Sequence, residues 1–337
     1  MGHVESGATF LAALTLALHL VPATTLSDDA VRVLRVRRDG AGDFTTVTDA
    51  VNSIPSGNNR RVVVWIATGE YREKVTVDRS KPFVTFYGER KGHATTTMPV
   101  ITYDGTALRY GTVDSATVAV DADYFVAVNV AFVNSSPMPK ENSVGSQALA
   151  MRISGDKAAF YNCKFVGFQD TLCDDKGRHF FKDCYIQGTY DFIFGNGKSI
   201  YLRTTIESMA KGLSVITAQG RESMAQDTGF TFLHCNITGS GSGNTYLGRA
   251  WKKSPRVVFA YTYMGSLINS RGWFINQLAQ AKSNKTIYYG EYRCMGPGAV
   301  STGRVKFRKI LSDEEAKPFL SMAYIHGGKW VVPPPKL

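Results

Sequence analysis

Two aspartates in the middle of the chain have the spacing of a catalytic carboxylate pair. Asp170 lies seven residues after Cys163, and Asp191 lies seven residues after Cys184, within two copies of one repeated phrase. If the two copies form neighbouring strands of a parallel sheet, the carboxylates stand about 5 Å apart. Two carboxylates this close repel each other when both are ionised, so the pKa of one is raised. Such a pair can supply a general acid beside a nucleophile or base, and the alternative is an ordinary pair of turn aspartates.

The repeated phrase predicts the elements that position this pair. It consists of a hydrophobic run, a Cys or small residue, and alternating apolar residues that usually end at Gly. The copies follow one another at 33, 21, 20, 31 and 26 residues, with no helical pattern between them. Short strands at such intervals predict an all-β parallel β-helix with an internal cysteine ladder, and the alternative is a β-sandwich with irregular strands. The copies are aligned on Val130, Cys163, Cys184, Thr204, Cys235 and Tyr261.

Helix-start signals stand near both ends of this repeat region. A solenoid needs a cap at each end, because its terminal coils would otherwise leave the core open. Residues Thr46–Asp49 resemble a capping box, and residues Ser312–Glu315 form a second one at the start of the sequence SDEEAKPFLSMAYI. We therefore expect one short capping helix near each end.

The charge of the chain favours an anionic partner. Lys and Arg outnumber Asp and Glu by 39 to 28, which gives a net charge of +11 at pH 7. The sequence has no dense Lys/Arg run and no recognised nucleic-acid-reading motif, so we expect an acidic polysaccharide and no nucleic acid. A basic surface without a specific partner is the alternative.

The first 26 residues have the features of a secretory signal peptide. Phe10–Val21 is an apolar stretch too short to span a bilayer, and small residues follow it at 23–25. We expect residues 1–26 to be removed and residues 27–337 to form a single secreted domain. No later segment has 18 consecutive apolar residues, so we expect no membrane association.

Sequons and cysteines add two smaller expectations. The N-x-S/T sequons at Asn134, Asn236 and Asn284 would allow glycosylation along a secretory route. The five cysteines have the spacing neither of a dense disulfide framework nor of a zinc site. At least one thiol must stay unpaired within the chain.

Seven motifs, in order along the chain, resemble those of the plant pectin methylesterases. The resemblance covers nearly all of the chain after about residue 33. The phrases QDTLCDDKG and HFFKDCYI and the PPPKL tail are most similar to a group of pollen-type and short-form members without a pro-region. The motifs are DGAGDFTTVTDAV at 39–51, GEYREKV at 69–75, GTVDSAT at 111–117, QALAMR at 147–152, GFQDTL at 167–172, DFIFG at 191–195 and LGRAW at 247–251.

The resemblance implies a right-handed parallel β-helix, no metal or other cofactor, and hydrolysis of pectin methyl esters through a covalent intermediate. Asp191 would attack the ester carbonyl, and Asp170 would protonate the departing methanol and then activate a water. Gln147 and Gln169 would donate hydrogen bonds to the developing oxyanion. Arg249 would pair with Asp191 and keep it ionised. The residues expected to bind the sugar chain are Trp251, Phe194, Tyr246 and Trp273.

Two positions depart from the family pattern. Cys173 stands where many relatives carry a Tyr after QDTL, which would remove one aromatic contact to the sugar, and Tyr190 stands where many carry a Val before DFIFG. Neither change removes a catalytic group. Cys173 and Cys184 are 11 residues apart on neighbouring coils, so they form either a disulfide or two inert thiols.

Two other functions compete with the esterase. A pectin-cleaving glycoside hydrolase could use a carboxylate pair at this spacing, but it would leave Gln147, Gln169 and Arg249 without roles, and the NTD and RIK motifs of polygalacturonases are absent. A catalytically silent wall-binding protein would not need the full set of five polar residues, which is Gln147, Gln169, Asp170, Asp191 and Arg249. We therefore expect a secreted, monomeric cell-wall esterase that acts on pectin, with a proteinaceous pectinesterase inhibitor as a candidate partner.

Overall fold

The computed structural model of the chain describes residues 31–90, 98–140, 143–274 and 284–334. The chain divides into the units Met1–Val31 and Arg32–Leu337, and the second unit contains the described helices and strands. The proposed signal peptide, residues 1–26, lies outside the described residues, so its cleavage and the domain boundary at residue 27 stay predictions. Within the described ranges, no helix has the length and apolar character needed to cross a bilayer.

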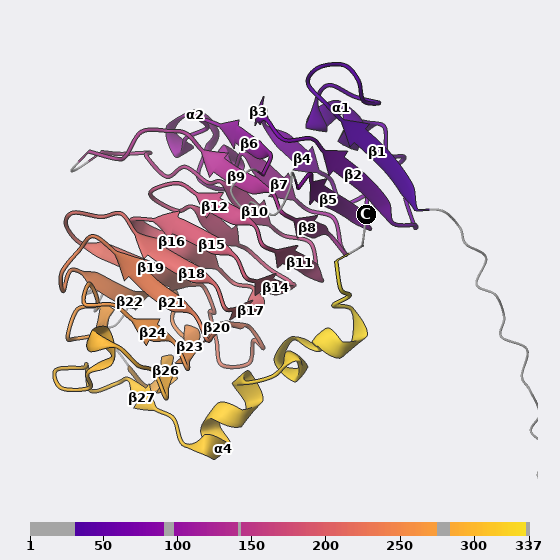
Figure 1. Cartoon of the computed structure of the whole chain (residues 1–337). Helices are drawn as coiled ribbons and strands as arrows, with labels where there is room; N and C mark the ends of the chain where they lie inside the picture. The colour runs from indigo at the N-terminus through magenta and orange to yellow at the C-terminus, as the bar shows by residue number, and fades with distance from the viewer. Residues whose placement is uncertain (1–30, 91–97, 141–142, 275–283, 335–337) are drawn as a thin grey trace, which may run out of the picture. The chain divides into compact units, whose positions relative to one another are not determined.

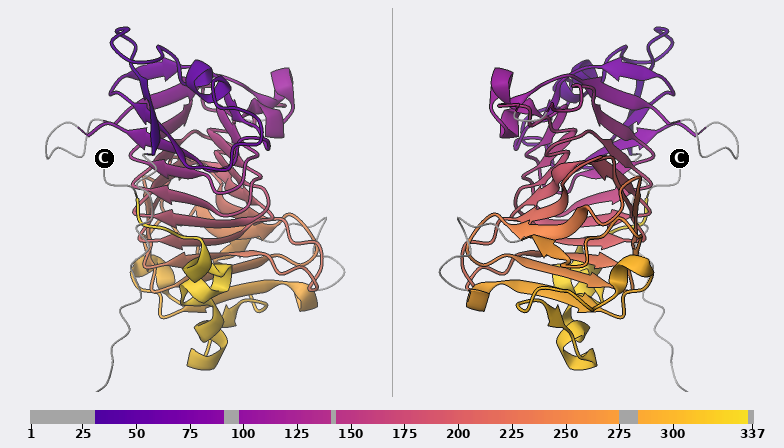
Figure 2. Two further views of the ribbon diagram at one scale, coloured as in Figure 1. Left: turned by 90° about the vertical axis from the view of Figure 1, so that its right-hand side faces the viewer. Right: turned by 90° about the vertical axis from the view of Figure 1, so that its left-hand side faces the viewer.

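The second unit winds repeatedly through three sheets, which we name A, B and C (Figures 1 and 2). Each strand pairs with the corresponding strand of the coils before and after it, and the pairing is parallel; β11, for example, pairs with β8 and β14. A sandwich built from hairpins would show antiparallel ladders. The predicted parallel β-helix is therefore confirmed.

In the described residues, sheet A has eleven strands, in the order β1 (Arg32–Val36), β2 (Val62–Ile66), β5 (Val84–Gly88), β8 (Val126–Val128), β11 (Ala158–Tyr161), β14 (Arg178–Lys182), β17 (Lys198–Leu202), β20 (Gly229–Leu233), β23 (Arg256–Ala260), β26 (Tyr288–Tyr292) and β27 (Lys309–Ile310). Sheet B comprises β3 (Glu70–Arg72), β6 (Val100–Tyr103), β9 (Ala131–Asn134), β12 (Lys164–Val166), β15 (Tyr185–Gly188), β18 (Thr205–Ser208), β21 (Asn236–Gly239) and β24 (Tyr263–Met264). Sheet C comprises β4 (Val75–Val77), β7 (Val118–Val120), β10 (Met151–Ile153), β13 (Leu172–Asp174), β16 (Tyr190–Gly195), β19 (Ser214–Gln219), β22 (Thr245–Ala250) and β25 (Trp273–Phe274).

Aromatic rings stack inside the coils because successive strands of sheet A are in register. Phe181 lies 4.9 Å from Phe160 and 4.4 Å from Tyr201 between ring centroids, and the rings of both pairs are stacked in nearly parallel planes. The column continues through Phe232 to Phe259 with centroid distances of 4.5 Å. Such a column buries a large apolar area at the spacing of parallel strands, and it holds the coils in one register.

The cysteine ladder forms at the corner between sheets A and B, with one correction. Cys163, Cys184 and Cys235 are buried there in the main core, and Cys294 packs against the same core, although the alignment did not include it. The alignment on Tyr261 is wrong by one residue. Asn236 pairs with Tyr263, so the residue opposite Cys235 is Thr262. The residues that turn this corner have positive φ between 48° and 57°, and they are Asn129, Asn162, Asp183, Arg203, His234, Tyr261 and Arg293.

The proposed disulfide between Cys173 and Cys184 does not form. All five cysteines are free thiols. Cys184 belongs to the main core, whereas Cys173 belongs to a small separate cluster with Leu149, Phe194 and Ala218. Because the two side chains belong to different clusters, the prediction of two inert thiols holds.

Both predicted capping helices form. In α1 (Val47–Asn52), the Thr46 side chain accepts a hydrogen bond from the backbone of Asp49, and the buried face of the helix joins the main core. Ser312 and Glu315 form a full capping box at α4 (Asp313–Ala316). The segment after α4 continues as η4 (Lys317–Phe319), η5 (Met322–Ile325) and η6 (Gly327–Lys329), and it packs against β14 and β17 of sheet A rather than across the end (Figure 1).

The remaining short helices among the described residues lie in the connections between strands. They are α2 (Ala107–Tyr110), η1 (Val113–Ser115), η2 (Asn284–Thr286) and η3 (Pro297–Ala299). The backbone N–H of Ala107 in α2 donates to the carbonyl of Gln147, which connects this helix to the segment that carries a predicted site residue.

Candidate active site

Strands β13 and β16 place Asp170 and Asp191 at the same position of adjacent coils. Leu172 pairs with Ile193, so the residues two positions earlier, Asp170 and Asp191, are also opposite each other. The backbone N–H of Asp170 donates to the carbonyl of Tyr190 over 3.0 Å, which fits this register. The predicted phase of the two aspartates is therefore confirmed.

The backbone is strained at both aspartates. Asp170 has a φ of 62° and Asp191 a φ of 49°, in the left-handed region that residues other than Gly rarely adopt. A strained residue of this kind costs about 1–3 kcal/mol and persists only where the surrounding structure holds it. At Asp191 the register with β19 also shifts, and the next two residues, Phe192 and Ile193, both enter the core. At Asp191 the positive φ therefore coincides with a break in the normal strand alternation.

Arg249 distinguishes the two carboxylates. Its Nε donates to both oxygens of Asp191, at 2.8 and 2.9 Å, and its Nη2 donates to Oδ2. Within the described residues, Asp170 accepts no such bond from a cation. The predicted contact between Arg249 and Asp191 is confirmed.

Burial and charge give the two aspartates different acidities. Both side chains are buried, with exposed fractions of 8% for Asp170 and 6% for Asp191. Burial, reinforced by the charge of Asp191, raises the pKa of Asp170 well above its ordinary value. Burial also raises the pKa of Asp191, but the hydrogen bonds and charge of Arg249 oppose that rise. The pair is thus arranged to hold a proton on Asp170 and a negative charge on Asp191.

Gln147 and Gln169 lie on the coils beside the aspartates. Both side chains are half-buried, and Ala148, the residue after Gln147, donates from its backbone to the carbonyl of Gln169. No group in the described part of the chain forms a hydrogen bond with either side-chain amide. Both amides are therefore available as neutral donors to a bound molecule.

Trp251 is the exposed aromatic residue of the site. Its exposed fraction is 43%, and its ring meets Phe194 edge to face at a centroid distance of 5.9 Å. A side chain at Gly220 would stand 3.0 Å from the Trp251 ring, so a glycine there gives the indole its room. Phe194 is itself only 5% exposed, so it packs against Trp251 and has little surface left for contact with a ligand.

The other two predicted sugar-binding residues differ from each other. Tyr246 is half-buried on β22, three residues before Arg249, and its ring lies 4.9 Å from Phe274. Trp273 is fully buried, stacks on Tyr289 at 4.0 Å and donates its indole N–H to Glu291. The assignment of Trp273 to sugar binding is therefore wrong, because the side chain points into the core.

Ala218 and Tyr190 are two site residues whose roles the sequence analysis missed. Ala218 lies on β19, in register with Phe194 on one side and Arg249 on the other. Tyr190 places its ring under the Arg249 guanidinium, 5.6 Å from its carbon. The only sequence signal for Tyr190 was its departure from the family pattern, and Ala218 gave none.

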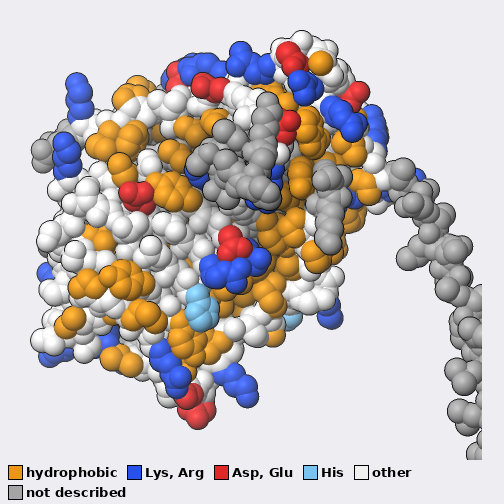
Figure 3. Space-filling view, in the orientation of Figure 1, with side chains coloured by type: hydrophobic (Ala, Val, Ile, Leu, Met, Phe, Trp, Pro, Cys, Tyr) orange, Lys and Arg blue, Asp and Glu red, His pale blue; other side chains and the backbone are white. Residues whose placement is uncertain are grey.

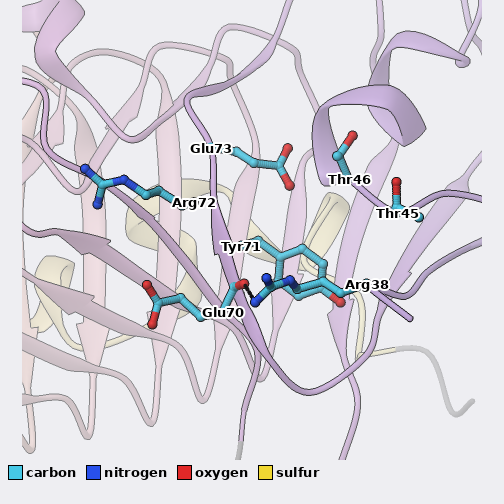
Figure 4. Close-up of a pocket in the computed structure, with 7 residues that line it drawn as sticks. All are labelled: Arg38, Thr45, Thr46, Glu70, Tyr71, Arg72 and Glu73. Atoms are coloured by element: carbon cyan, nitrogen blue, oxygen red, sulfur yellow. Dashed lines mark hydrogen bonds between the residues drawn. The ribbon is translucent and has the colours of Figure 1, made fainter. Parts of the chain in front are cut away.

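A separate pocket of about 540 Å³ lies near the N-terminal cap, away from the aspartate pair. Most of its charged groups already have partners. Glu73 binds the start of α1, and Arg72 pairs with Asp104. Arg38 donates to the carbonyl of Glu70 (Figure 4). Its lining residues are Arg38, Thr45, Thr46, Glu70, Tyr71, Arg72 and Glu73. These bonds hold the first coil together, so we do not count the pocket as part of the candidate active site. Among the described residues, no three His, Cys, Asp or Glu side chains are grouped to hold a metal ion.

Comparison with solved structures defines the class of the protein. The chain is similar to a pectin methylesterase from carrot, with a TM-score of 0.79 and 34% identity over 88% of this chain and 94% of that one. It is also similar to a pectin methylesterase solved in complex with a hexasaccharide, with a TM-score of 0.73 and 25% identity over 90% of this chain and 98% of that one. The fold is thus that of a β-helical pectin methylesterase.

The family follows from the sequence matches. A family model described as Pectinesterase matches residues 33–328. A relative named putative pectinesterase 63, from Arabidopsis thaliana, is 54% identical over 300 residues, which cover 89% of this chain and 86% of the relative. The chain belongs to the pectinesterase family and is an esterase. The resemblance to pollen-type members stays a prediction.

Proposed function

We propose that this esterase hydrolyses the methyl esters of pectin with Asp191 as the nucleophile and Asp170 as the general acid and base. The observation that carries this assignment is the Arg249 guanidinium, which bonds to Asp191 and not to Asp170. A carboxylate nucleophile must be ionised and fixed in direction, whereas the group that protonates methanol must keep its proton at working pH. Arg249 therefore favours the ionised form of Asp191 over that of Asp170, as this chemistry requires.

The first half of the reaction forms a covalent intermediate. A carboxylate oxygen of Asp191 attacks the ester carbonyl carbon, and the carbonyl electrons move to the oxygen, where the Gln147 and Gln169 amides donate hydrogen bonds. When the carbonyl re-forms, the bond to the methoxy group breaks and Asp170 gives its proton to the departing methanol. The products of this half are methanol, an anhydride between Asp191 and the sugar carboxyl group, and ionised Asp170.

The second half restores the enzyme. Asp170, now a base, removes a proton from a water whose oxygen attacks the sugar carbonyl of the anhydride. The bond to Asp191 then breaks, which leaves a free sugar carboxyl group, an ionised Asp191 and a protonated Asp170. One water is consumed for each methanol released, and neither a metal nor a redox partner enters the balance.

The test is methanol release from methylated pectin by the variants Asp191→Ala and Asp170→Ala. We expect each variant to lose essentially all activity and to keep a cooperative thermal transition. Asp183→Ala is a matched control, because Asp183 also has a positive φ and also pairs with an arginine, Arg203, but lies at the corner between sheets A and B. Retention of more than a few per cent of the wild-type methanol release by either catalytic variant would refute its role, and new reducing ends without methanol would indicate a glycoside hydrolase.

We also propose that the protein acts outside the cell, in the wall, as a monomer that a proteinaceous inhibitor can bind. The family assignment and the positive net charge support a wall location, since demethylated pectin is a polyanion. Of the sequons, Asn236 is exposed on β21, whereas Asn134 is buried and its amide donates to the carbonyls of Gly105 and Leu149. Glycosylation is therefore expected at Asn236 and not at Asn134, while the Asn284 side chain lies outside the described part. Mass spectrometry of the secreted protein would show which asparagine carries a glycan and where the mature chain begins.

A further inference from the structure

Tyr190 continues a row of residues that begins with the two glutamines. The Ala148 N–H donates to the Gln169 carbonyl, and the Asp170 N–H donates to the Tyr190 carbonyl, so the same backbone bond joins each pair of coils. These bonds place Gln147, Gln169 and Tyr190 beside one another on three successive coils. We call Gln147, Gln169 and Tyr190 the donor row. All three side chains are half-buried.

The ring of Tyr190 contacts the arginine that directs the nucleophile. The Arg249 guanidinium carbon lies 5.6 Å from the ring centroid, and the same guanidinium donates to Asp191. An arginine over a tyrosine face is held by a cation–π attraction, which strengthens when the pair is shielded from water. Arg249 and Tyr190 are both partly shielded. The ring therefore limits the directions in which Arg249 can hold the Asp191 carboxylate.

The hydroxyl of Tyr190 forms no hydrogen bond with any other group in the described part of the chain. It is also absent from the fully buried polar atoms that lack a partner, so it is not completely enclosed by protein. Burial and the nearby charge of Asp191 raise the pKa of Tyr190, so the phenol keeps its proton at neutral pH. It is thus a neutral donor beside the nucleophile, as the two amides of the row are.

We propose that Tyr190 is a further substrate-contact residue of this site, whose hydroxyl donates to a bound galacturonate unit while its ring positions Arg249 against Asp191. This proposal rests on the function proposed above. The two parts of the side chain have separate consequences, because the hydroxyl meets the substrate and the ring meets the enzyme. Two substitutions can therefore separate them.

Tyr190→Phe keeps the ring and removes the hydroxyl. We expect KM for methylated pectin oligomers to rise about three- to tenfold, the effect of one lost neutral hydrogen bond, with little change in kcat or its pH profile. Tyr190→Val also removes the ring. We expect kcat to fall in addition, and the acidic limb of the kcat profile to move to higher pH, because a less firmly held Arg249 stabilises ionised Asp191 less.

Tyr185→Phe is the matched control. Tyr185 is a half-buried tyrosine on β15 in sheet B, and its hydroxyl bonds to Gln187 and Glu207 away from the aspartates. Its loss should leave KM, kcat and the pH profile unchanged, and thermal melting of all three variants checks the fold. An unchanged KM in Tyr190→Phe would overturn the hydroxyl contact, and a Tyr190→Val variant with the kinetics and pH profile of Tyr190→Phe would overturn the role of the ring. Either result would leave the function above intact if the wild-type protein releases methanol, whereas a wild-type protein without methanol release would refute that function itself.

Discussion

Arg249 reaches Asp191 across an intervening strand. Arg249 lies on β22 and Asp191 on β16, and β19 runs between them, so the two backbones are separated by two strand spacings, about 9.6 Å. On β19 the residue in register with Arg249 is Ala218, which is 2% exposed. Ala218 is in register with Phe194, three residues beyond Asp191, so Arg249 must also reach back along the sheet. We infer that the small side chain of Ala218 leaves room for this reach, and we expect the ion pair to depend on it.

The first prediction concerns this space. Ala218→Leu should displace the Arg249 side chain from Asp191, and kcat for methanol release should fall about 100-fold, as a misplacement of about 1 Å at a reacting group can cause. Ala218→Ser adds only a hydroxyl and should keep most of the activity. Steady-state kinetics of the two variants checks this, and a fully active Ala218→Leu enzyme would show that the arginine does not need this path.

The second prediction concerns stability and pH. The pKa of Asp170 is raised in the folded chain, so between its unfolded value of about 3.9 and its folded value the native state binds more protons than the unfolded state. Stability from this residue is thus full below the unfolded pKa and declines as pH rises through the folded pKa, by up to about 1.4 kcal/mol per pH unit. Asp170→Asn removes that decline, so the variant should gain stability relative to wild type as pH rises.

Denaturant unfolding of wild type and Asp170→Asn at a series of pH values from 4 upward measures this effect. The inactive variant should be more stable than wild type at neutral pH, and the difference should shrink toward pH 4. Parallel pH dependences in the two proteins would mean that Asp170 does not carry the raised pKa.

The third prediction separates two tryptophans. Trp251→Ala should raise KM for pectin oligomers about tenfold and leave the melting temperature nearly unchanged, because Trp251 is 43% exposed. Trp273→Ala should lower the free energy of unfolding by about 3–5 kcal/mol, because its ring is fully buried against Tyr289. Kinetics and unfolding of both variants test the contrast, which would fail if Trp273→Ala folded as stably as wild type.

The fourth prediction concerns salt. The positive side chains on the face in Figure 3 lie in scattered groups rather than in one patch, which fits a non-specific attraction for a polyanion. Retention on demethylated pectin should fall steeply between about 0.05 and 0.5 M salt, since the Debye length shrinks about threefold over that range. Binding of a short, fully methylated oligomer, which is nearly neutral, should change much less. Retention on demethylated pectin that is indifferent to salt would refute the electrostatic account.

The sequence could predict what depends on local order and on equal spacing. The distance of 21 residues from Cys163 to Cys184 equals that from Asp170 to Asp191, so both pairs must keep one phase on adjacent coils. The two helix N-caps are equally local, because Thr46 and Ser312 each accept a hydrogen bond from the residue three positions later. These features needed no knowledge of the rest of the chain.

Only the tertiary structure decided which side of a strand each residue takes. Strand faces alternate residue by residue, so a shift of one position reverses them, and left-handed residues such as Asp191 break the alternation where the pattern gives no warning. For this reason the alignment on Tyr261 was one residue out, and Trp273 was assigned to the cleft although it lies in the core. The ion pair between Arg249 and Asp191 spans 58 residues of sequence, and the resemblance to the family predicted it. The sequence could not predict that Ala218 lies in register with Arg249. Residues that share one patch of a β-helix come from coils of different lengths, and only folding brings those coils into register.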